Sequence, residues 1–193
     1  VMMSTYNGEK YLAEQIRSII NQEGVYTRIF IRDDGSSDGT VDLIKKYIVH
    51  YSERIVLFLG KNIGYRCSFL SLLSLVDDAD YYAFADQDDV WLQDKCSHAI
   101  AMLSKRPDEI ALYTSGLKIV DAKLNILSNK NYYNLNNTLG GYFSRARLAG
   151  CTFLFTHELK EKAKLFSSLN MPTERMPAHD FVVGSIAYSC GSV

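Results

Sequence analysis

The sequence has few of the features that mark special classes of protein. Only 3 of its 193 residues are proline, and no segment has the repetitive composition of collagen or of a low-complexity chain. With 47% hydrophobic and 22% charged residues, the composition is that of an ordinary globular protein and excludes a disordered one. A chain of this length buries about 70% of the surface that it exposes when unfolded, so we expect one sizeable core.

Charge of one sign, long apolar runs and paired cysteines are also lacking. The 21 basic and 22 acidic residues leave a net charge of −1, which argues against the basic surface of a nucleic-acid-binding protein. No apolar run reaches the roughly 18 to 20 residues that span a bilayer, and the N-terminus lacks the basic flank of a signal peptide. The four cysteines form no CxxC pair, so we expect a reducing cytoplasm rather than a disulfide framework.

Short apolar segments alternate with helical patterns through the first half of the chain. Residues 1–3, 28–32, 55–59 and 81–85 predict strands, and apolar residues at helical spacing follow each of the first three. This alternation predicts parallel strands joined by right-handed crossovers. We therefore expect an α/β fold, with a mostly parallel central sheet and helices on both faces.

The second half of the chain is less regular. Residues 110–114 and 152–156 predict strands, and 117–127 predict a hairpin or an extended excursion. The stretch 129–138 is rich in Asn and Tyr and predicts a loop, and 180–188 predict a final helix.

Clustered polar residues and glycines follow the predicted strands of the first half, in the loops 4–8, 33–39, 60–64 and 86–89. In a parallel sheet these loops meet at the edge formed by the carboxyl ends of the strands, where ligands bind. The sequence therefore predicts a binding site at this edge.

The sharpest single motif is the acidic run at 86–89. Asp86 and Asp88 stand one residue apart at the end of a strand and can converge on a hard divalent cation, which would neutralise a diphosphate leaving group. The alternative interpretation is a solvated acidic turn without a metal, in which Asp89 or Asp94 caps the next helix.

The loop at 33–39 carries three aspartates, two serines and two glycines. Turn formation accounts for this composition, with Thr40 as the cap of the next helix. An acidic loop repels phosphate, so a functional carboxylate here would instead accept hydrogen bonds from a base imide or a ribose hydroxyl.

Five motifs in order resemble the inverting family 2 glycosyltransferases, which have the GT-A fold. They are Ser-Thr-Tyr-Asn-Gly at 4–8, Asp-Asp-Gly-Ser-Ser-Asp-Gly-Thr at 33–40, Asn-Ile-Gly at 62–64, Asp-Gln-Asp-Asp-Val-Trp at 86–91 with Asp-Lys at 94–95, and Gly-Cys-Thr at 150–152. The motif at 86–91 is similar to that of the rhamnosyltransferase-like branch, which builds bacterial surface polysaccharides.

The resemblance implies a role for each matching position. Asp34 would bind the base, Asp88 would be the principal metal ligand, and Asp86 would support the metal or the donor sugar, with Mn²⁺ or Mg²⁺ as the cofactor. Gly150 and Cys151 would shape the acceptor side, unless they only pack at the entry to a strand. The nucleotide-sugar-binding residues would be Ser4, Thr5, Tyr6, Glu9, Asp34, Asn62, Gly64, Arg66 and Asp86.

Inversion at the anomeric carbon in one displacement needs a base that takes the proton of the acceptor hydroxyl. In the family this carboxylate lies near the start of a late helix, often in a His-Asp pair. His179-Asp180 matches that pair, so the resemblance implies Asp180 as the catalytic base. A helix cap is the alternative role for Asp180.

We therefore expect a single catalytic domain over 1–193, with a nucleotide-sugar-binding half at 1–90 and an acceptor-side half at 91–193 that continues in a longer chain. The predicted activity is metal-dependent transfer of a sugar from a UDP- or TDP-sugar to a glycan or lipid-linked acceptor. The lipid-linked acceptors of the family imply a cytoplasmic location at the inner face of the plasma membrane, with peripheral association through segments beyond this chain.

Two other functions remain open at this point. A GT-A domain could bind a sugar nucleotide without transferring the sugar. The run 86–90 also satisfies the DxDx(T/V) pattern of haloacid-dehalogenase phosphohydrolases, although those enzymes place it after the first strand. Sugar-nucleotide pyrophosphorylases share the fold, but residues 4–9 lack the basic glycine-rich loop that such enzymes need.

Overall fold

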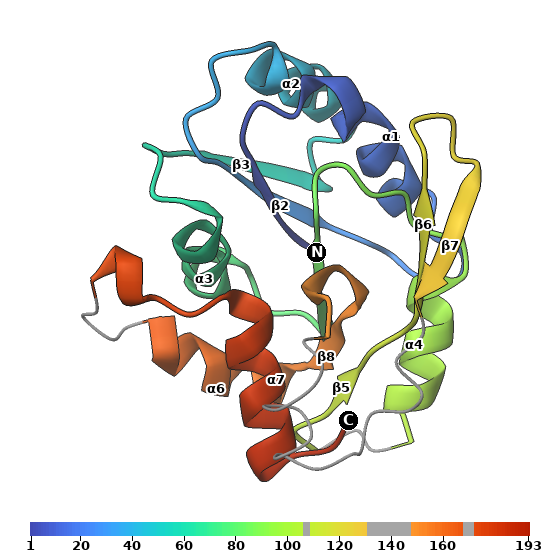
Figure 1. The fold of residues 1–193 in the computed structure, drawn as a ribbon, viewed down its shortest axis with the longest axis vertical. Coiled ribbons are helices and arrows are strands. Elements are labelled where there is room, and N and C mark those ends of the chain that lie inside the picture. Colours follow the sequence, from blue (N-terminus) through green and yellow to red (C-terminus); the bar gives the residue numbers. More distant parts are fainter. Residues whose placement is uncertain (106–108, 131–147, 168–171) are drawn as a thin grey trace.

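The computed structural model describes residues 1–105, 109–130, 148–167 and 172–193. In its first half, strands and helices alternate as the apolar spacing predicts (Figure 1). The elements of this half are β1 (Met2–Thr5), α1 (Glu9–Ile20), β2 (Ile29–Asp33), α2 (Thr40–His50), β3 (Ile55–Leu59), α3 (Tyr65–Leu75), β4 (Tyr81–Ala85) and α4 (Lys95–Leu103).

The second half adds two strands to the main sheet, and a separate hairpin. The predicted strands at 110–114 and 152–156 both form, but both are shorter than predicted. The second is shorter because a 3₁₀ turn occupies its predicted start. The hairpin alternative for 117–127 is confirmed, and most of the predicted loop at 129–138 lies outside the described residues. The elements are β5 (Leu112–Tyr113), β6 (Leu117–Val120), β7 (Ile126–Lys130), η1 (Gly150–Thr152), β8 (Leu154–Thr156), α6 (His157–Ser167), η2 (Thr173–Arg175) and α7 (His179–Cys190).

The main sheet has six strands in the order β3-β2-β1-β4-β8-β5. Strands β1 to β4 are parallel, and β8 runs antiparallel to both of its neighbours. Thr5, Asp33 and Leu59 are paired across β1, β2 and β3, so these three strands end level with one another. The predicted mostly parallel sheet is thus confirmed, and the loops that follow its strands emerge at one edge.

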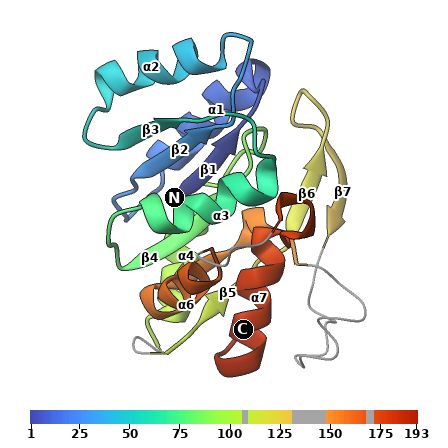
Figure 2. The same cartoon turned by 90° about the vertical axis from the view of Figure 1, so that its left-hand side faces the viewer.

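Two hydrophobic cores lie on opposite faces of the sheet, between its strands and the helices that cover them. The arrangement of these helices around the sheet is seen in Figure 2. On one face Met2, Phe30 and Phe84 pack against α3, α6 and α7. On the other face Met3 and Ile31, the neighbours of Met2 and Phe30, pack against α1, α2 and α4. The alternation of side chains along each strand therefore buries both faces, as expected for strands that are apolar throughout.

The longest helices in the described part of the chain, α1 and α7, have 12 residues each. Among the described residues, no helix combines the length and the apolar character that a bilayer crossing requires.

Candidate active site

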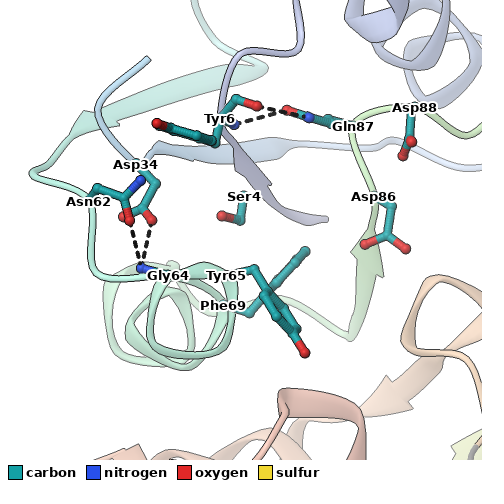
Figure 3. A pocket seen from close by; sticks show the side chains of 10 residues that line it. All are labelled: Ser4, Tyr6, Asp34, Asn62, Gly64, Tyr65, Phe69, Asp86, Gln87 and Asp88. Carbon is teal, nitrogen blue, oxygen red and sulfur yellow. Dashed lines mark hydrogen bonds between the residues drawn. The ribbon is translucent and has the colours of Figure 1, made fainter. Parts of the chain in front are cut away.

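A pocket of about 330 Å³ lies at the edge where β1, β2, β3 and β4 end (Figure 3). Asp34 and Asn62 form one side, Asp86 and Asp88 form the opposite side, and Ser4 lies between them. The predicted meeting of the strand-end loops is therefore observed. The lining residues are Ser4, Tyr6, Asp34, Asn62, Gly64, Tyr65, Phe69, Asp86, Gln87 and Asp88.

The buried carboxylate of Asp34 organises the first side of the pocket. It accepts backbone N–H groups from Ile63 at 3.0 Å and Gly64 at 2.8 Å, and a hydrogen bond from the Arg32 guanidinium. Arg32 is itself buried and also donates to the carbonyl of Lys61. Gly64 has φ of +80°, a backbone angle that favours glycine and turns these N–H groups toward Asp34.

The neighbouring Asp33 has a different environment, inside the turn that follows β2. Its Oδ1 accepts the N–H groups of Gly35 and Ser36, and its Oδ2 accepts the hydroxyls of Thr5 and Ser36. Thr5 is therefore a buried residue that joins β1 to this turn and does not line the pocket.

Two further residues that the sequence assigns to the nucleotide lie outside the pocket lining. The carboxylate of Glu9 accepts the N–H of Gly39 at 3.0 Å, which ties the start of α1 to the start of α2. Arg66 is exposed on the first turn of α3, where its Nε donates to the hydroxyl of Tyr65 at 3.2 Å.

The predicted helix caps differ in detail. Gly39, not Thr40, is the N-cap residue of α2, and the Thr40 hydroxyl donates to Asp38 at 2.5 Å while accepting the N–H of Gly8. Asp94 is the N-cap residue of α4, without a side-chain cap bond. Loop 33–39 also contacts the loop after β1 directly, through hydrogen bonds of Asn7 with Ser36 and Ser37.

Gln87 joins the two sides of the site. Its Oε1 accepts the N–H of Tyr6 at 2.9 Å, and its Nε2 donates to the carbonyl of Tyr6 at 3.1 Å (Figure 3). This paired contact fixes the loop after β1 against the acidic turn after β4. Tyr6 itself is 49% exposed and lines the pocket, so it is accessible to a ligand.

The acidic turn gathers charge in a partly desolvated place. Burial, and after it the charges of Asp89 and Asp88, raise the pKa of Asp86 to about 6. Asp86, Asp89 and the thiol of Cys151 form a cluster whose potential ligand atoms lie within 4.8 Å of one another. Asp88 is outside that cluster and faces the pocket (Figure 3).

The carboxylates of this turn fit a divalent cation, since Asp86 and Asp89 lie together and Asp86 and Asp88 line the same pocket. Carboxylate oxygens are the ligands that Mg²⁺ and Mn²⁺ prefer, and a cation would offset both the burial and the charges of Asp89 and Asp88 that raise the pKa of Asp86. Burial, with the charges of Asp89 and Asp86, raises the pKa of the Cys151 thiol. The thiol therefore stays protonated beside these carboxylates, as their hydrogen-bonding neighbour.

Asp180 lies in the first turn of α7, whose N-cap residue is Ala178, so Asp180 is not the cap. Its Oδ1 accepts the N–H of Phe181 at 2.7 Å. The charge of Asp180 adds to the burial that raises the pKa of Asp86, and it also acts on Arg66. The candidate base thus lies within electrostatic reach of the acidic turn.

The residue before it, His179, is an aromatic packing residue. Its ring stacks on Phe69 with centroids 4.0 Å apart and meets the edge of Phe84 at 4.5 Å. Only 5% of His179 is exposed, and neither ring nitrogen has a hydrogen-bond partner among the described residues. Burial lowers its pKa to about 3, so the ring is neutral and poorly suited to proton transfer at pH 7.

Gly150 packs against this pair of residues. A Cβ at Gly150 would lie 2.5 Å from Nε2 of His179 and 3.2 Å from Cβ of Asp180. The close approach needs glycine, and it brings η1 against the start of α7. Of the two roles that the sequence leaves open for Gly150, packing is observed.

Sequence reasoning missed several residues of this site. Tyr65, Phe69 and Gln87 line the pocket, yet the first two read only as parts of a helix and Gln87 as the spacer between two aspartates. Arg32 does not line the pocket but donates to the lining residue Asp34. A charged residue inside the apolar strand 28–32 was the available signal for the buried Arg32–Asp34 ion pair.

Comparison with known proteins identifies the class to which this site belongs. The fold matches solved GT-A glycosyltransferases, which agrees with the predicted fold. The sequence profile of glycosyl transferase family 2 matches residues 1–166, so the chain belongs to that family.

Two relatives are similar over different shares of the chain. The dTDP-rhamnosyl transferase RfbG of Shigella flexneri is 33% identical over 196 residues, which cover 96% of this chain and 64% of RfbG. The putative glycosyltransferase EpsE of Bacillus subtilis is 35% identical over 105 residues, which cover 54% of this chain and 38% of EpsE. The similarity to RfbG agrees with the rhamnosyltransferase-like branch that the motifs indicate.

Two solved structures share the fold. TarS 1–349 of S. aureus in complex with UDP has a TM-score of 0.62 and 19% identity, over 97% of this chain and 54% of that one. The mannosyltransferase PcManGT of Pyrobaculum calidifontis, in complex with GDP-Man and Mn²⁺, has a TM-score of 0.69 and 16% identity, over 98% of this chain and 52% of that one. This chain thus spans about half of each of these proteins.

Proposed function

We propose that this chain is the donor-binding and catalytic part of a metal-dependent inverting glycosyltransferase. It would transfer a sugar from a UDP- or TDP-sugar to a glycan or lipid-linked acceptor in bacterial surface polysaccharide synthesis. The observation that carries the proposal is one pocket that has Asp34 on one side and Asp86 and Asp88 on the other. A nucleoside diphosphate has its base and its diphosphate at opposite ends, which matches this separation.

The base would lie at the side of Asp34, against the exposed Tyr6. Asp34 already accepts two backbone N–H groups and a guanidinium, so its carboxylate is fixed in place before a ligand arrives. A fixed acceptor costs less ordering on binding than a mobile one. Ser4, Asn62 and Gly64 would contact the ribose and the diphosphate, and Arg66 would approach them from the rim.

Asp88 and Asp86 would hold the divalent cation, which when bound would neutralise charge on the departing diphosphate. The acceptor hydroxyl would attack the anomeric carbon on the face opposite the departing diphosphate. As the new carbon–oxygen bond forms, Asp180 would take the hydroxyl proton and the bond to the diphosphate oxygen would break. The products are the glycosylated acceptor and a nucleoside diphosphate.

The relatives support the nucleotide donor and the divalent metal of this proposal. TarS was solved with UDP, and PcManGT with GDP-Man and Mn²⁺, which are ligands of the class proposed here. RfbG is named as a dTDP-rhamnosyl transferase, which supports a TDP-sugar as one of the two donors. The location at the inner face of the plasma membrane remains part of the proposal, because it depends on the acceptor being lipid-linked.

The test separates donor binding from transfer. Asp180→Asn should bind the sugar nucleotide with unchanged affinity and lose transfer by about 10³-fold, because the base is absent. Asp88→Ala should lose both the binding of the sugar nucleotide and the transfer of the sugar. Asp42→Asn, a substitution of an exposed carboxylate on α2, is the matched control and should leave both unchanged.

The measured quantities are the dissociation constant of the sugar nucleotide and the rate of nucleoside diphosphate release with acceptor present. Normal transfer by Asp180→Asn would remove the base assignment. Tight donor binding by the unmodified protein without transfer to any acceptor would favour the alternative of a binding domain.

A further inference from the structure

Lys95 places a positive charge behind the acidic turn. It is the first residue of α4, and its Nζ donates to the carbonyl of Cys151 at 2.5 Å. The same Nζ lies 3.6 Å from the centroid of the Trp91 ring, a cation–π contact with a buried indole. Burial lowers the pKa of Lys95 to about 8, and the charges of Asp89 and Asp86 act in the opposite direction, so the ammonium is charged at pH 7.

The partner of Lys95 connects two parts of the site. Cys151 belongs to η1, and its thiol hydrogen-bonds with Asp89. The residue before it, Gly150, packs against His179 and Asp180. A chain of contacts therefore runs from the acidic turn through Cys151 and Gly150 of η1 to the carboxylate that we assign as the base, and Lys95 holds η1 in this chain through the carbonyl of Cys151.

We propose that Lys95 is a positioning residue, an internal cation that aligns η1 and Asp180 with the acidic turn. It has two effects, and both rest on the proposed function. The hydrogen bond to Cys151 fixes the distance between the acidic turn and the start of α7. The positive charge partly neutralises Asp86 and Asp89, so that the turn does not bind a free cation tightly before the donor diphosphate is present.

The two effects change in opposite directions when the ammonium is removed. Without the positive charge, the carboxylates attract a divalent cation more strongly, because one repulsive Coulomb interaction is lost. Without the hydrogen bond, Asp180 loses its alignment, and misplacement of a catalytic group by about 1 Å can cost about 10²-fold in rate. A residue that only supported the fold would weaken both cation binding and transfer.

The experiment compares Lys95→Met with the unmodified protein. Methionine keeps an apolar stem against Trp91 and removes the ammonium. Binding of Mn²⁺ alone, without nucleotide, is measured by calorimetric titration or by the paramagnetic resonance of free Mn²⁺. We expect about tenfold tighter Mn²⁺ binding by Lys95→Met and about a hundredfold lower turnover at saturating donor.

Two variants serve as controls. Lys46→Met removes an exposed lysine of α2, so it lowers the net charge equally and should change neither quantity. Lys95→Arg keeps the charge, so it should return Mn²⁺ affinity to that of the unmodified protein and restore part of the turnover. If Lys95→Met does not fold, Lys95→Gln is tested for Mn²⁺ binding in the same way.

Mn²⁺ binding that is weaker or unchanged in the variant without the ammonium would overturn the inference, as would the absence of Mn²⁺ binding in both proteins. The proposed function fails in a different way, if the unmodified protein transfers no sugar from any donor. In that event the comparison of Mn²⁺ affinities still decides whether Lys95 opposes the binding of a cation.

Discussion

Asp34 shows at the scale of a single residue how this site is built. Its side chain and that of Arg32 are at least nine-tenths buried, and the two form an ion pair. Arg32 also donates to the Ser68 hydroxyl at 3.1 Å and to the Lys61 carbonyl at 3.2 Å. The pair therefore connects β2, the loop after β3 and α3.

We predict that Asp34→Ala lowers the free energy of unfolding by about 3 kcal/mol, because it leaves a buried guanidinium without its counter-charge. Urea denaturation measures this change. The double variant Arg32→Met with Asp34→Ala should recover much of the loss, since no unpaired charge remains. A small loss in Asp34→Ala would mean that the guanidinium finds other partners.

Residue identities of this kind were only partly predictable. The motif at 33–39 identified Asp34 as a candidate, and the structure places it in the pocket. Thr5 and Glu9 were equally plausible by sequence, but their side chains contact Asp33 and Gly39. Which of several neighbouring polar side chains faces the cavity depends on turn geometry. That geometry cannot be deduced from the spacing of residues along the chain.

At the scale of elements, the contact between two loops is decisive. Gln87 makes two hydrogen bonds with the backbone of Tyr6, which hold the loop after β1 against the acidic turn. Both bonds are exposed, so their net contribution to folding is about 1 kcal/mol each at most.

Gln87→Ala should therefore weaken donor binding more than it weakens the fold. We expect the dissociation constant of the nucleoside diphosphate to rise about tenfold, because Tyr6 must be ordered when the ligand binds. Calorimetric titration measures the constant, and thermal unfolding measures the fold. Gln93→Ala, at an exposed glutamine near α4, is the control, and equal effects of the two substitutions would refute the role of Gln87.

The elements themselves were largely predictable. Strands apolar on both faces and helices apolar on one face follow directly from the spacing of residues such as Leu12, Ile16 and Ile19, which are fully buried in α1. The lengths of β5 and β8 were not predictable, because pairing with a neighbouring strand sets them. The 3₁₀ turn η1, which shortens the predicted strand, is held by packing of Gly150 against His179.

At the scale of the whole molecule, the acidic turn opposes folding when no metal is bound. The pKa of Asp86 is raised to about 6, so the folded state holds its proton more tightly than the unfolded state does. Its contribution to stability is therefore unfavourable above pH 6 and fades as the pH falls toward the ordinary pKa of an aspartate. The buried His179, with a pKa near 3, opposes this trend, since acid protonates it in the unfolded state first.

Asp86→Asn isolates the carboxylate, because His179 is present in both proteins. Without metal, we predict that the substitution stabilises the protein at pH 7.5 and that this gain disappears by about pH 4. Urea denaturation in EDTA at several pH values measures the gain. A gain that is the same at every pH would show that burial and the neighbouring charges do not raise the pKa of Asp86.

The central claim is that one pocket binds a nucleoside diphosphate through a divalent cation. The most direct test is calorimetric titration of the protein with UDP, TDP, GDP and CDP, each with Mn²⁺ and again with EDTA. We predict that UDP or TDP binds with Mn²⁺ and that EDTA abolishes the binding. If none of the four binds under either condition, the claim that this pocket is a donor site is contradicted.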